Sequence, residues 1–193
     1  NCACPVLTPA AMNYRGLGSI RFKSVSNPDP PQFDALRELS FDLPTGEMAF
    51  LTGHSGAGKS TLLKLIMRIE KASSGQVIVN GRDQGALKGR QIALARRDIG
   101  MVYQDHNLLD DRSVFDNVAL PLIIAGMPPR DIPNRVYAAL ALVGLKHRAT
   151  AMPLELSGGE QQRGVIARAV VGKPPVIVAD EPHGTLDPPL AGA

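Results

Sequence analysis

The chain has 193 residues, 44% of them hydrophobic and 20% charged, which are the proportions of an ordinary globular domain. This length accommodates one α/β core, and the composition argues against a disordered, collagen-like or coiled-coil chain. The net charge of +3 is small and the Lys and Arg residues are scattered, so no nucleic-acid partner is expected. The longest apolar run, residues 118–124, contains Pro121 and is too short to span a membrane.

Residues 1–19 show neither helical nor strand periodicity and are expected to be a flexible or foreign leader. They hold both cysteines, Cys2 and Cys4, whose spacing lacks the further ligands of a metal site. They also lack the basic start and the apolar run of a signal peptide. We therefore expect residues 20–193 to form one folded domain that works in the cytoplasm.

The first predicted elements are strands. Residues 20–25 and the alternating apolar pattern of residues 36–43 predict a β-hairpin. After a Pro-Thr-Gly turn, the continuous apolar run of residues 48–51 predicts a buried central strand.

A helix is predicted next, over residues 59–69, because its apolar residues recur on one face. Two short strands follow, at residues 76–79, where an Asn-Gly turn ends the strand, and at residues 99–103. The residues predicted to form the buried helix face are Leu62, Leu63, Leu65, Ile66 and Ile69.

A mainly helical insert is predicted over about residues 105–156. Ser113 is a candidate N-cap, two prolines at 128–129 predict a break, and Val136, Leu140 and Val143 share the spacing of one helix face. A helix at residues 160–171 and a strand at residues 176–179 restore the α/β alternation.

Residues 53–60 match the pattern G-x-x-x-x-G-K-[ST] of a phosphate-binding loop. Glycines let such a loop fold around phosphate oxygens and offer them N–H groups, and the positive end of the next helix faces the anion. Lys59 is expected to reach the β and γ phosphates of ATP, and the Ser60 hydroxyl to ligate Mg²⁺. A glycine turn before a helix is the alternative, which the strand and helix predicted on either side disfavour. The residues expected to bind the nucleotide are Gly53, His54, Ser55, Gly56, Ala57, Gly58, Lys59, Ser60 and Thr61.

The apolar strand at residues 176–179 is followed by two carboxylates, Asp180 and Glu181. Asp180 is expected to hold Mg²⁺, and Glu181 to orient and deprotonate the attacking water. An acidic strand end that is merely solvated is the alternative for any single pair of this kind. The phosphate loop in the same chain favours the catalytic interpretation.

The sequence Leu-Ser-Gly-Gly-Glu-Gln-Gln-Arg at residues 156–163 resembles the signature of the ATP-binding cassette (ABC) ATPases. A Ser-Gly-Gly backbone that enters a helix makes a second anion site, and the alternative is an ordinary helix N-cap at Ser157. The resemblance implies a P-loop NTPase fold with a mixed core sheet and a helical insert. It also implies a head-to-tail homodimer in which the signature faces the γ-phosphate of ATP held by the other subunit. The signature residues expected to act in trans are Ser157, Gly158, Gly159, Glu160 and Gln161.

The resemblance assigns two more positions by their order in the chain. Gln104 is similar to the glutamine of this family that senses Mg²⁺ and nucleotide and contacts the membrane partner. Asp187 is similar to the residue whose loop crosses the dimer interface. As isolated residues both would be ordinary surface polar groups.

Within the family, residues 53–66, 97–109, 116–126 and 156–163 resemble the FtsE type, which serves bacterial cell division with an integral membrane partner of the FtsX type. This implies a protein on the inner face of the cell membrane, attached through that partner. Four residues are expected near the groove that receives the partner, or else in the local core: Leu108, Leu109, Val114 and Phe115.

The chain departs from the family pattern at several points. Asp29 stands where an aromatic residue usually stacks on adenine. His183 lies too close to Glu181 to be the switch histidine, and the chain ends at Ala193, so a C-terminally truncated cassette is expected. Gly164 and Val165 invert the usual order after the signature.

Three functions are therefore compared. The first is an ATP-hydrolysing subunit of an FtsEX-like complex, for which ATPases of lipoprotein release or macrolide export are close alternatives. The second is a nucleotide-binding module with little hydrolysis. A DNA-repair ATPase is disfavoured because the chain lacks long coiled-coil arms between its nucleotide motifs.

Overall fold

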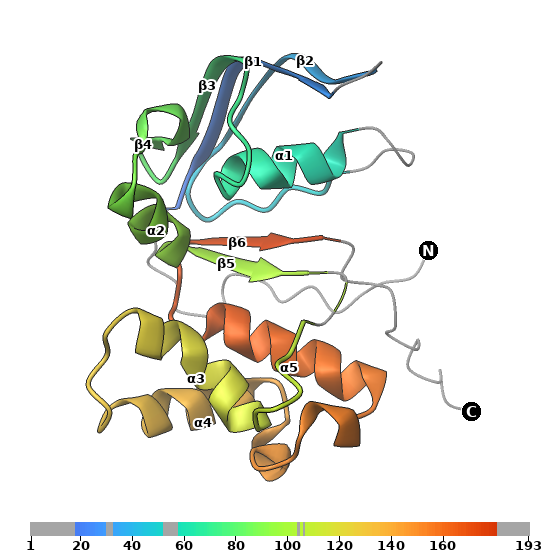
Figure 1. The fold of residues 1–193 in the computed structure, drawn as a ribbon, viewed down its shortest axis with the longest axis vertical. Coiled ribbons are helices and arrows are strands. Elements are labelled where there is room, and N and C mark those ends of the chain that lie inside the picture. Colours follow the sequence, from blue (N-terminus) through green and yellow to red (C-terminus); the bar gives the residue numbers. More distant parts are fainter. Residues whose placement is uncertain (1–17, 30–32, 52–57, 104, 106, 181–193) are drawn as a thin grey trace. The chain divides into compact units, whose positions relative to one another are not determined.

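The computed structural model of the chain describes residues 18–29, 33–51, 58–103, 105 and 107–180 (Figure 1). Their contacts group into two compact units, one up to Ile99 and one from Gly100 onward. Each unit has its own helices and its own core.

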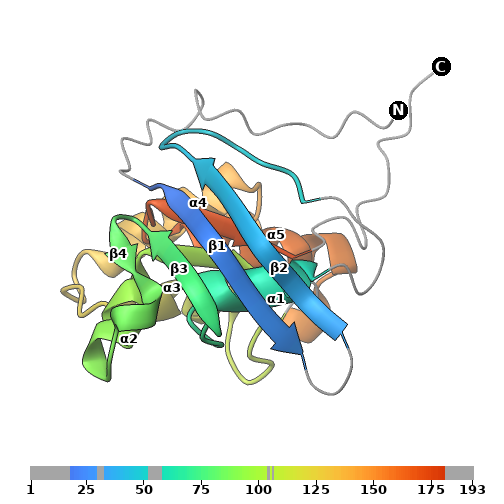
Figure 2. The same cartoon turned by 90° about the horizontal axis from the view of Figure 1, so that it is seen from above.

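The first unit contains a four-stranded antiparallel sheet in the order β2-β1-β3-β4 (Figure 2). The pairing of Phe22 with Phe41 stacks two rings whose centroids lie 4.7 Å apart. Asn80 and Gly81 both have positive φ, as the tight turn of a two-residue hairpin requires. The predicted hairpin of β1 and β2 and the predicted turn at Asn80-Gly81 are thus confirmed. The strands are β1 (Ile20–Asp29), β2 (Phe33–Leu43), β3 (Ser74–Val79) and β4 (Arg82–Asp83).

Helix α1 (Lys59–Ile66) covers one face of this sheet (Figure 2). It ends earlier than predicted because Arg68 adopts φ of 55° and the Ile69 N–H donates back to the Lys64 carbonyl at 2.8 Å. Ile69 is therefore 53% exposed instead of buried. The 3₁₀ turn η2 (Gln84–Ala86) and helix α2 (Arg90–Arg97) complete the unit.

The prediction of a buried strand at residues 48–51 is wrong. The described chain forms no strand there, and Met48, Phe50 and Leu51 are 53%, 73% and 50% exposed. An apolar run carries no information about its hydrogen-bonding partner, and without a neighbouring strand the backbone has no ladder to join.

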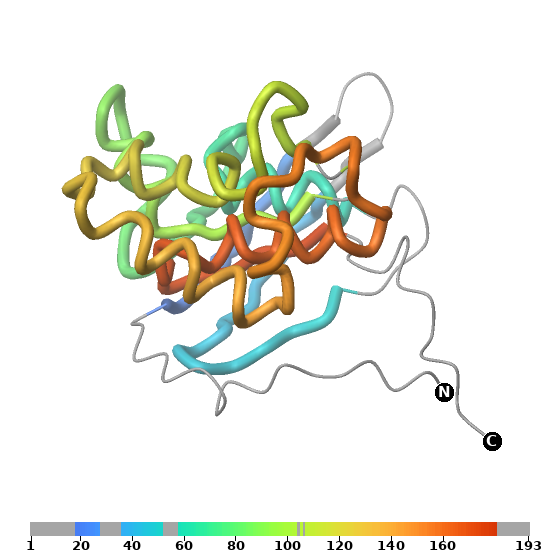
Figure 3. The backbone as a smooth tube through the Cα atoms, turned by 90° about the horizontal axis from the view of Figure 1, so that it is seen from below, coloured from blue at the N-terminus to red at the C-terminus, as the bar shows by residue number. Residues whose placement is uncertain are grey.

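The second unit packs three helices against one another and against a two-stranded sheet, β5-β6. Figure 3 shows the three helices side by side, coloured yellow to red, and the two strand arrows point the same way in Figure 1. The elements are β5 (Ile99–Val102), α3 (Val114–Ile124), α4 (Ile132–Leu142), α5 (Gly158–Val170) and β6 (Val176–Ala179), with 3₁₀ turns η3 (Lys146–Arg148) and η4 (Pro153–Glu155).

The mainly helical character predicted before the signature is confirmed in this unit. Ser113 caps α3 by accepting a hydrogen bond from the Asp116 N–H, and the two prolines lie between α3 and α4. Val136 and Leu140 are fully buried among the three helices, with Val143 partly buried beside them.

In the described part of the chain, no helix is both long enough and apolar enough to cross a membrane.

Candidate functional site

The start of α1 carries the described part of the phosphate loop. Gly58 is buried, has φ of 80°, and offers no side chain to cap the helix. The first turn contains no acidic residue, so its N–H groups keep the positive potential of a helix N-terminus. Lys59 is half-buried and Ser60 is exposed on this turn, and Thr61 is buried behind it. Gly53, His54, Ser55, Gly56 and Ala57 lie outside the described residues.

The carboxyl end of β6 carries the first predicted acid. The Asp180 N–H donates to the Val102 carbonyl at 2.9 Å, so Asp180 lies at the end of β5, next to the residue that precedes Gln104. The chain thus brings the Asp180 position and the start of the Gln104 loop to one end of the β5-β6 sheet. Gln104, Glu181 and Asp187 lie outside the described residues.

The signature opens α5 with a capping box. The Ser157 Oγ accepts from the Glu160 N–H at 3.3 Å, and the Glu160 Oε2 accepts from the Ser157 N–H at 2.9 Å. The N-cap alternative for Ser157 is therefore part of the observed geometry. The capping box satisfies the Glu160 N–H but leaves the N–H groups of Gly158 and Gly159, the first two helical residues, without an intrahelical acceptor.

The glycines of the signature lie on an open surface. A Cβ at Gly158 would meet no atom within 4 Å, and one at Gly159 would meet only the Arg163 guanidinium, at 3.9 Å. Packing within this unit therefore does not require either glycine. Their small size is of use to a group that approaches the helix start from outside.

Glu160 places a carboxylate at this helix start. Hydrogen bonds from the backbone and then the hydroxyl of Ser157, together with Arg148, lower the pKa of Glu160 below its usual 4.5 against the opposing effect of burial. Arg148 lies in η3, and its Nε is 3.3 Å from Glu160 Oε1. The carboxylate is therefore held ionised between a serine and an arginine.

Gln161 fixes the turn that precedes the signature. Its Nε2 donates to the Pro153 carbonyl at 2.9 Å and to the Leu156 carbonyl at 3.4 Å. The side chain therefore holds the backbone of η4 and of Leu156, the residue just before the N-cap Ser157.

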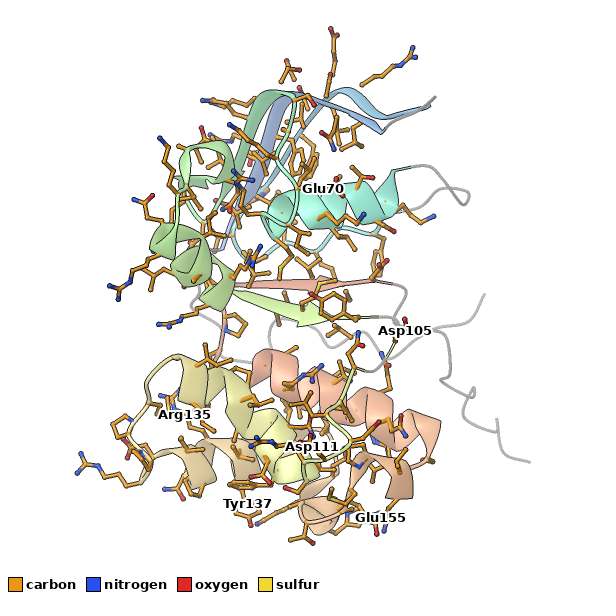
Figure 4. All side chains as sticks on the ribbon, viewed as in Figure 1. Glu70, Asp105, Asp111, Arg135, Tyr137 and Glu155 are labelled. Atoms are coloured by element: carbon orange, nitrogen blue, oxygen red, sulfur yellow. The ribbon has the colours of Figure 1, made fainter. Side chains whose placement is uncertain are left out.

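The residues expected near a partner groove or in the local core are mostly core. Val114 is fully buried, and Leu108 packs against the cluster of Val102, Val165 and Ala169. Phe115 is partly buried, with its ring centroid 5.4 Å from that of Tyr137, which Figure 4 labels on α4. Leu109 is the exposed member of the set, at 43%.

Two residues of this region were missed by sequence reasoning. Arg148 lies twelve positions before Glu160, so no local spacing links them. Asn117 is fully buried in α3, where its side chain bonds four backbone groups of residues 109–113. The only local signal for Asn117 is its position: it is a polar residue one turn after the N-cap Ser113, on the helix face that also buries Val114 and Val118.

Comparison with known proteins identifies the family of the chain. Residues 36–184 match the ABC transporter family. The chain is 57% identical over 172 residues to the cell division ATP-binding protein FtsE of Escherichia coli (strain K12), covering 89% of this chain and 78% of that protein. It is 45% identical to the methionine import ATP-binding protein MetN of Bradyrhizobium diazoefficiens, covering 88% of this chain and 50% of that protein.

A solved structure gives the same result for the fold. The ATP-binding cassette MJ0796, in a dimeric post-hydrolysis state bound to ADP and Pi, superimposes with a TM-score of 0.78 at 34% identity, over 87% of this chain and 76% of that one. The fold of the chain is therefore that of an ATP-binding cassette. The chain belongs to the ABC transporter family, as an ATP-binding cassette.

Proposed function

We propose that the chain is the ATP-hydrolysing subunit of an FtsEX-like complex in bacterial cell division, and that it passes ATP-driven dimer closure to an integral membrane partner of the FtsX type. The observation that carries this proposal is the identity with FtsE, which exceeds the identity with a methionine importer subunit and extends over more of the relative's length. The partner would hold the chain at the inner face of the membrane.

Phosphate binding is assigned to the start of α1. The N–H groups of its first turn face no capping side chain, and Gly58 adopts a backbone conformation that other residues rarely take. The Lys59 side chain would add a cation beside the β and γ phosphates. These groups bind and orient the nucleotide, and Glu181 would orient and deprotonate the attacking water.

The donor chemistry of the chain fits Mg²⁺. The exposed hydroxyl of Ser60 and the half-exposed carboxylate of Asp180 are hard oxygen ligands, and Gln104 would add a carbonyl oxygen. A bound Mg²⁺ would neutralise charge on the phosphate oxygens. Ser60 and Asp180 belong to different units. Each is therefore proposed as a Mg²⁺ ligand from its own position, Ser60 at the start of α1 and Asp180 just after β6.

The second half of each ATP site would come from the signature of another copy. The N–H groups of Gly158 and Gly159, which have no intrahelical acceptor, and the positive end of α5 suit a γ-phosphate that arrives from outside this unit. This agrees with the dimeric state in which MJ0796 was solved.

ATP turnover by the purified chain tests the catalytic assignment. Glu181→Gln is expected to lower kcat by at least about 100-fold, since general-base catalysis contributes roughly that much. Asp111→Asn, which removes an exposed carboxylate of the same unit, is the matched control and should retain the wild-type rate. An unchanged rate in Glu181→Gln would remove Glu181 from its role, and a wild-type chain without turnover would leave only a nucleotide-binding module.

Capture of the membrane partner tests the biological assignment. The protein, with the partner genes present, is solubilised from membranes and its bound integral membrane protein is identified by mass spectrometry. An FtsX-type protein is expected. Recovery of a lipoprotein-release or macrolide-export permease instead would overturn the cell-division assignment and leave the ATPase assignment intact.

A further inference from the structure

The start of α5 contains an electrostatic conflict. The proposed function brings a γ-phosphate to the N–H groups of Gly158 and Gly159, yet the next residue is Glu160, whose carboxylate folds back onto Ser157. An ionised carboxylate at this place lowers the positive potential of the helix start and repels an incoming phosphate. A nearby cation is needed to offset it.

Arg148 supplies that cation from a separate element. Its Nε lies 3.3 Å from Glu160 Oε1, and its Nη2 donates to the Glu155 carbonyl at 3.3 Å. Figure 4 labels Glu155 in the turn before α5, and the Glu155 carboxylate itself accepts from the Met152 N–H at 2.7 Å. The guanidinium thus joins η3, η4 and α5. The Ser157 Oγ also lies 3.0 Å from Glu160 Oε2, and it carries no charge. A second guanidinium, that of Arg163, lies near Gly159, but the ion pair of Glu160 in the described structure is with Arg148.

The Arg148 side chain is 40% exposed and that of Glu160 17%, so solvent screens the pair from one side and its contribution to stability is modest. Arg148 therefore has two separable roles, one in joining three elements and one in balancing the charge of Glu160. The pair also sets the charge that an incoming phosphate meets, because Glu160 directly follows Gly158 and Gly159 in the first turn of α5.

We propose that Arg148 is a positioning residue for the signature, which neutralises Glu160 so that the start of α5 accepts the γ-phosphate of ATP bound to another copy of the chain. This inference rests on the proposed function. Without Arg148, the unbalanced negative charge of Glu160 would act on the phosphate through a largely aqueous surface and weaken productive binding roughly threefold to tenfold.

The test is a double-mutant cycle read out by ATP turnover. Arg148→Met, which keeps the bulk of the side chain without its charge, is expected to lower kcat/KM roughly threefold to tenfold at low salt. The loss should shrink as ionic strength rises, because salt screens the repulsion. In a Glu160→Gln background the same substitution should change kcat/KM by less than about twofold. Arg130→Met, which removes an exposed arginine of the same unit, is the matched control and should leave kcat/KM unchanged.

Equal losses from Arg148→Met in both backgrounds, or a loss that salt does not reduce, would overturn the inference, because both results describe a structural role. Arg148→Lys keeps the charge and extends the test to the case in which Arg148→Met fails to fold. It should stay within about twofold of wild type, and a loss as large as about tenfold would also overturn the inference. A wild-type chain without ATP turnover refutes the proposed function itself, which separates the two failures.

Discussion

Replacement of Asn117 by Ala perturbs the loop that connects the Gln104 position to α3. Asn117 is fully buried, and its Oδ1 accepts from the Leu109 N–H at 2.7 Å. Its Nδ2 lies 3.0 to 3.1 Å from the carbonyls of Leu109, Arg112 and Ser113. These three acceptors share the two protons of the amide nitrogen. One side chain therefore holds four backbone groups of this loop.

The cost of the substitution follows from these bonds. Three hydrogen bonds contribute about 1 kcal/mol each, and the orphaned Leu109 N–H adds to this unless water reaches it. We therefore expect Asn117→Ala to lower the free energy of unfolding by about 2 to 4 kcal/mol, a large part of an ordinary domain's 5 to 15 kcal/mol. Asn117→Asp should cost at least as much, because an oxygen would then face the three carbonyls.

Urea denaturation measures the free energy, with Asn134→Ala, an exposed asparagine on α4, as the matched control. Hydrogen exchange at the Leu109 amide reports the local effect, and its protection should fall in Asn117→Ala and not in the control. If both Asn117 variants stay within about 0.5 kcal/mol of Asn134→Ala, the hydrogen-bond reasoning is wrong.

Three further predictions concern the second unit. Gly100→Ala should destabilise the fold by more than about 2 kcal/mol in thermal unfolding, because the new Cβ would lie 2.4 Å from the Ala169 carbonyl. In the control Gly172→Ala the new Cβ meets no atom within 4 Å, so stability should change little. Equal melting temperatures for the two variants would contradict this reasoning. Ser157→Ala should cost about 1 kcal/mol through loss of the α5 cap, and an unchanged stability would show that the cap is dispensable. The pKa of Glu160 is lowered in the folded state, so its ionised form stabilises the fold above pH 4.5, and this contribution is lost as the pH falls through the folded pKa. Glu160→Gln should therefore flatten the dependence of the free energy of unfolding on pH in that acidic range. An unchanged profile would contradict the assignment.

The sequence predicted those features of the fold that depend on residues close together in the chain. The N-cap at Ser113, the Asn80-Gly81 turn and the apolar face of α1 each depend on residues within a few positions. The structure confirms the first two, and it confirms the face of α1 except at Ile69. The end of α1 was missed because it is set by the backbone conformation of Arg68, which is not a residue that usually adopts positive φ.

Long-range partners could not be predicted from one sequence. The run at residues 48–51 has the composition of a buried strand, but burial depends on a neighbouring strand that periodicity does not identify. Arg148 acts on Glu160, twelve positions away, and Asn117 acts on backbone groups of the preceding loop, so neither residue belongs to a recognisable motif. The site motifs were recognisable because phosphate chemistry requires fixed residue types at fixed spacing.

ATP-dependent dimer formation by the Glu181→Gln variant tests the central claim most directly, because slow hydrolysis would retain the ATP that the two copies share. Sedimentation velocity with and without ATP measures the mass, and a nucleotide-binding assay under the same conditions confirms that the sites are filled. The account predicts a monomer without ATP and a dimer with it. A variant that binds ATP and remains a monomer at every protein concentration would contradict the shared site.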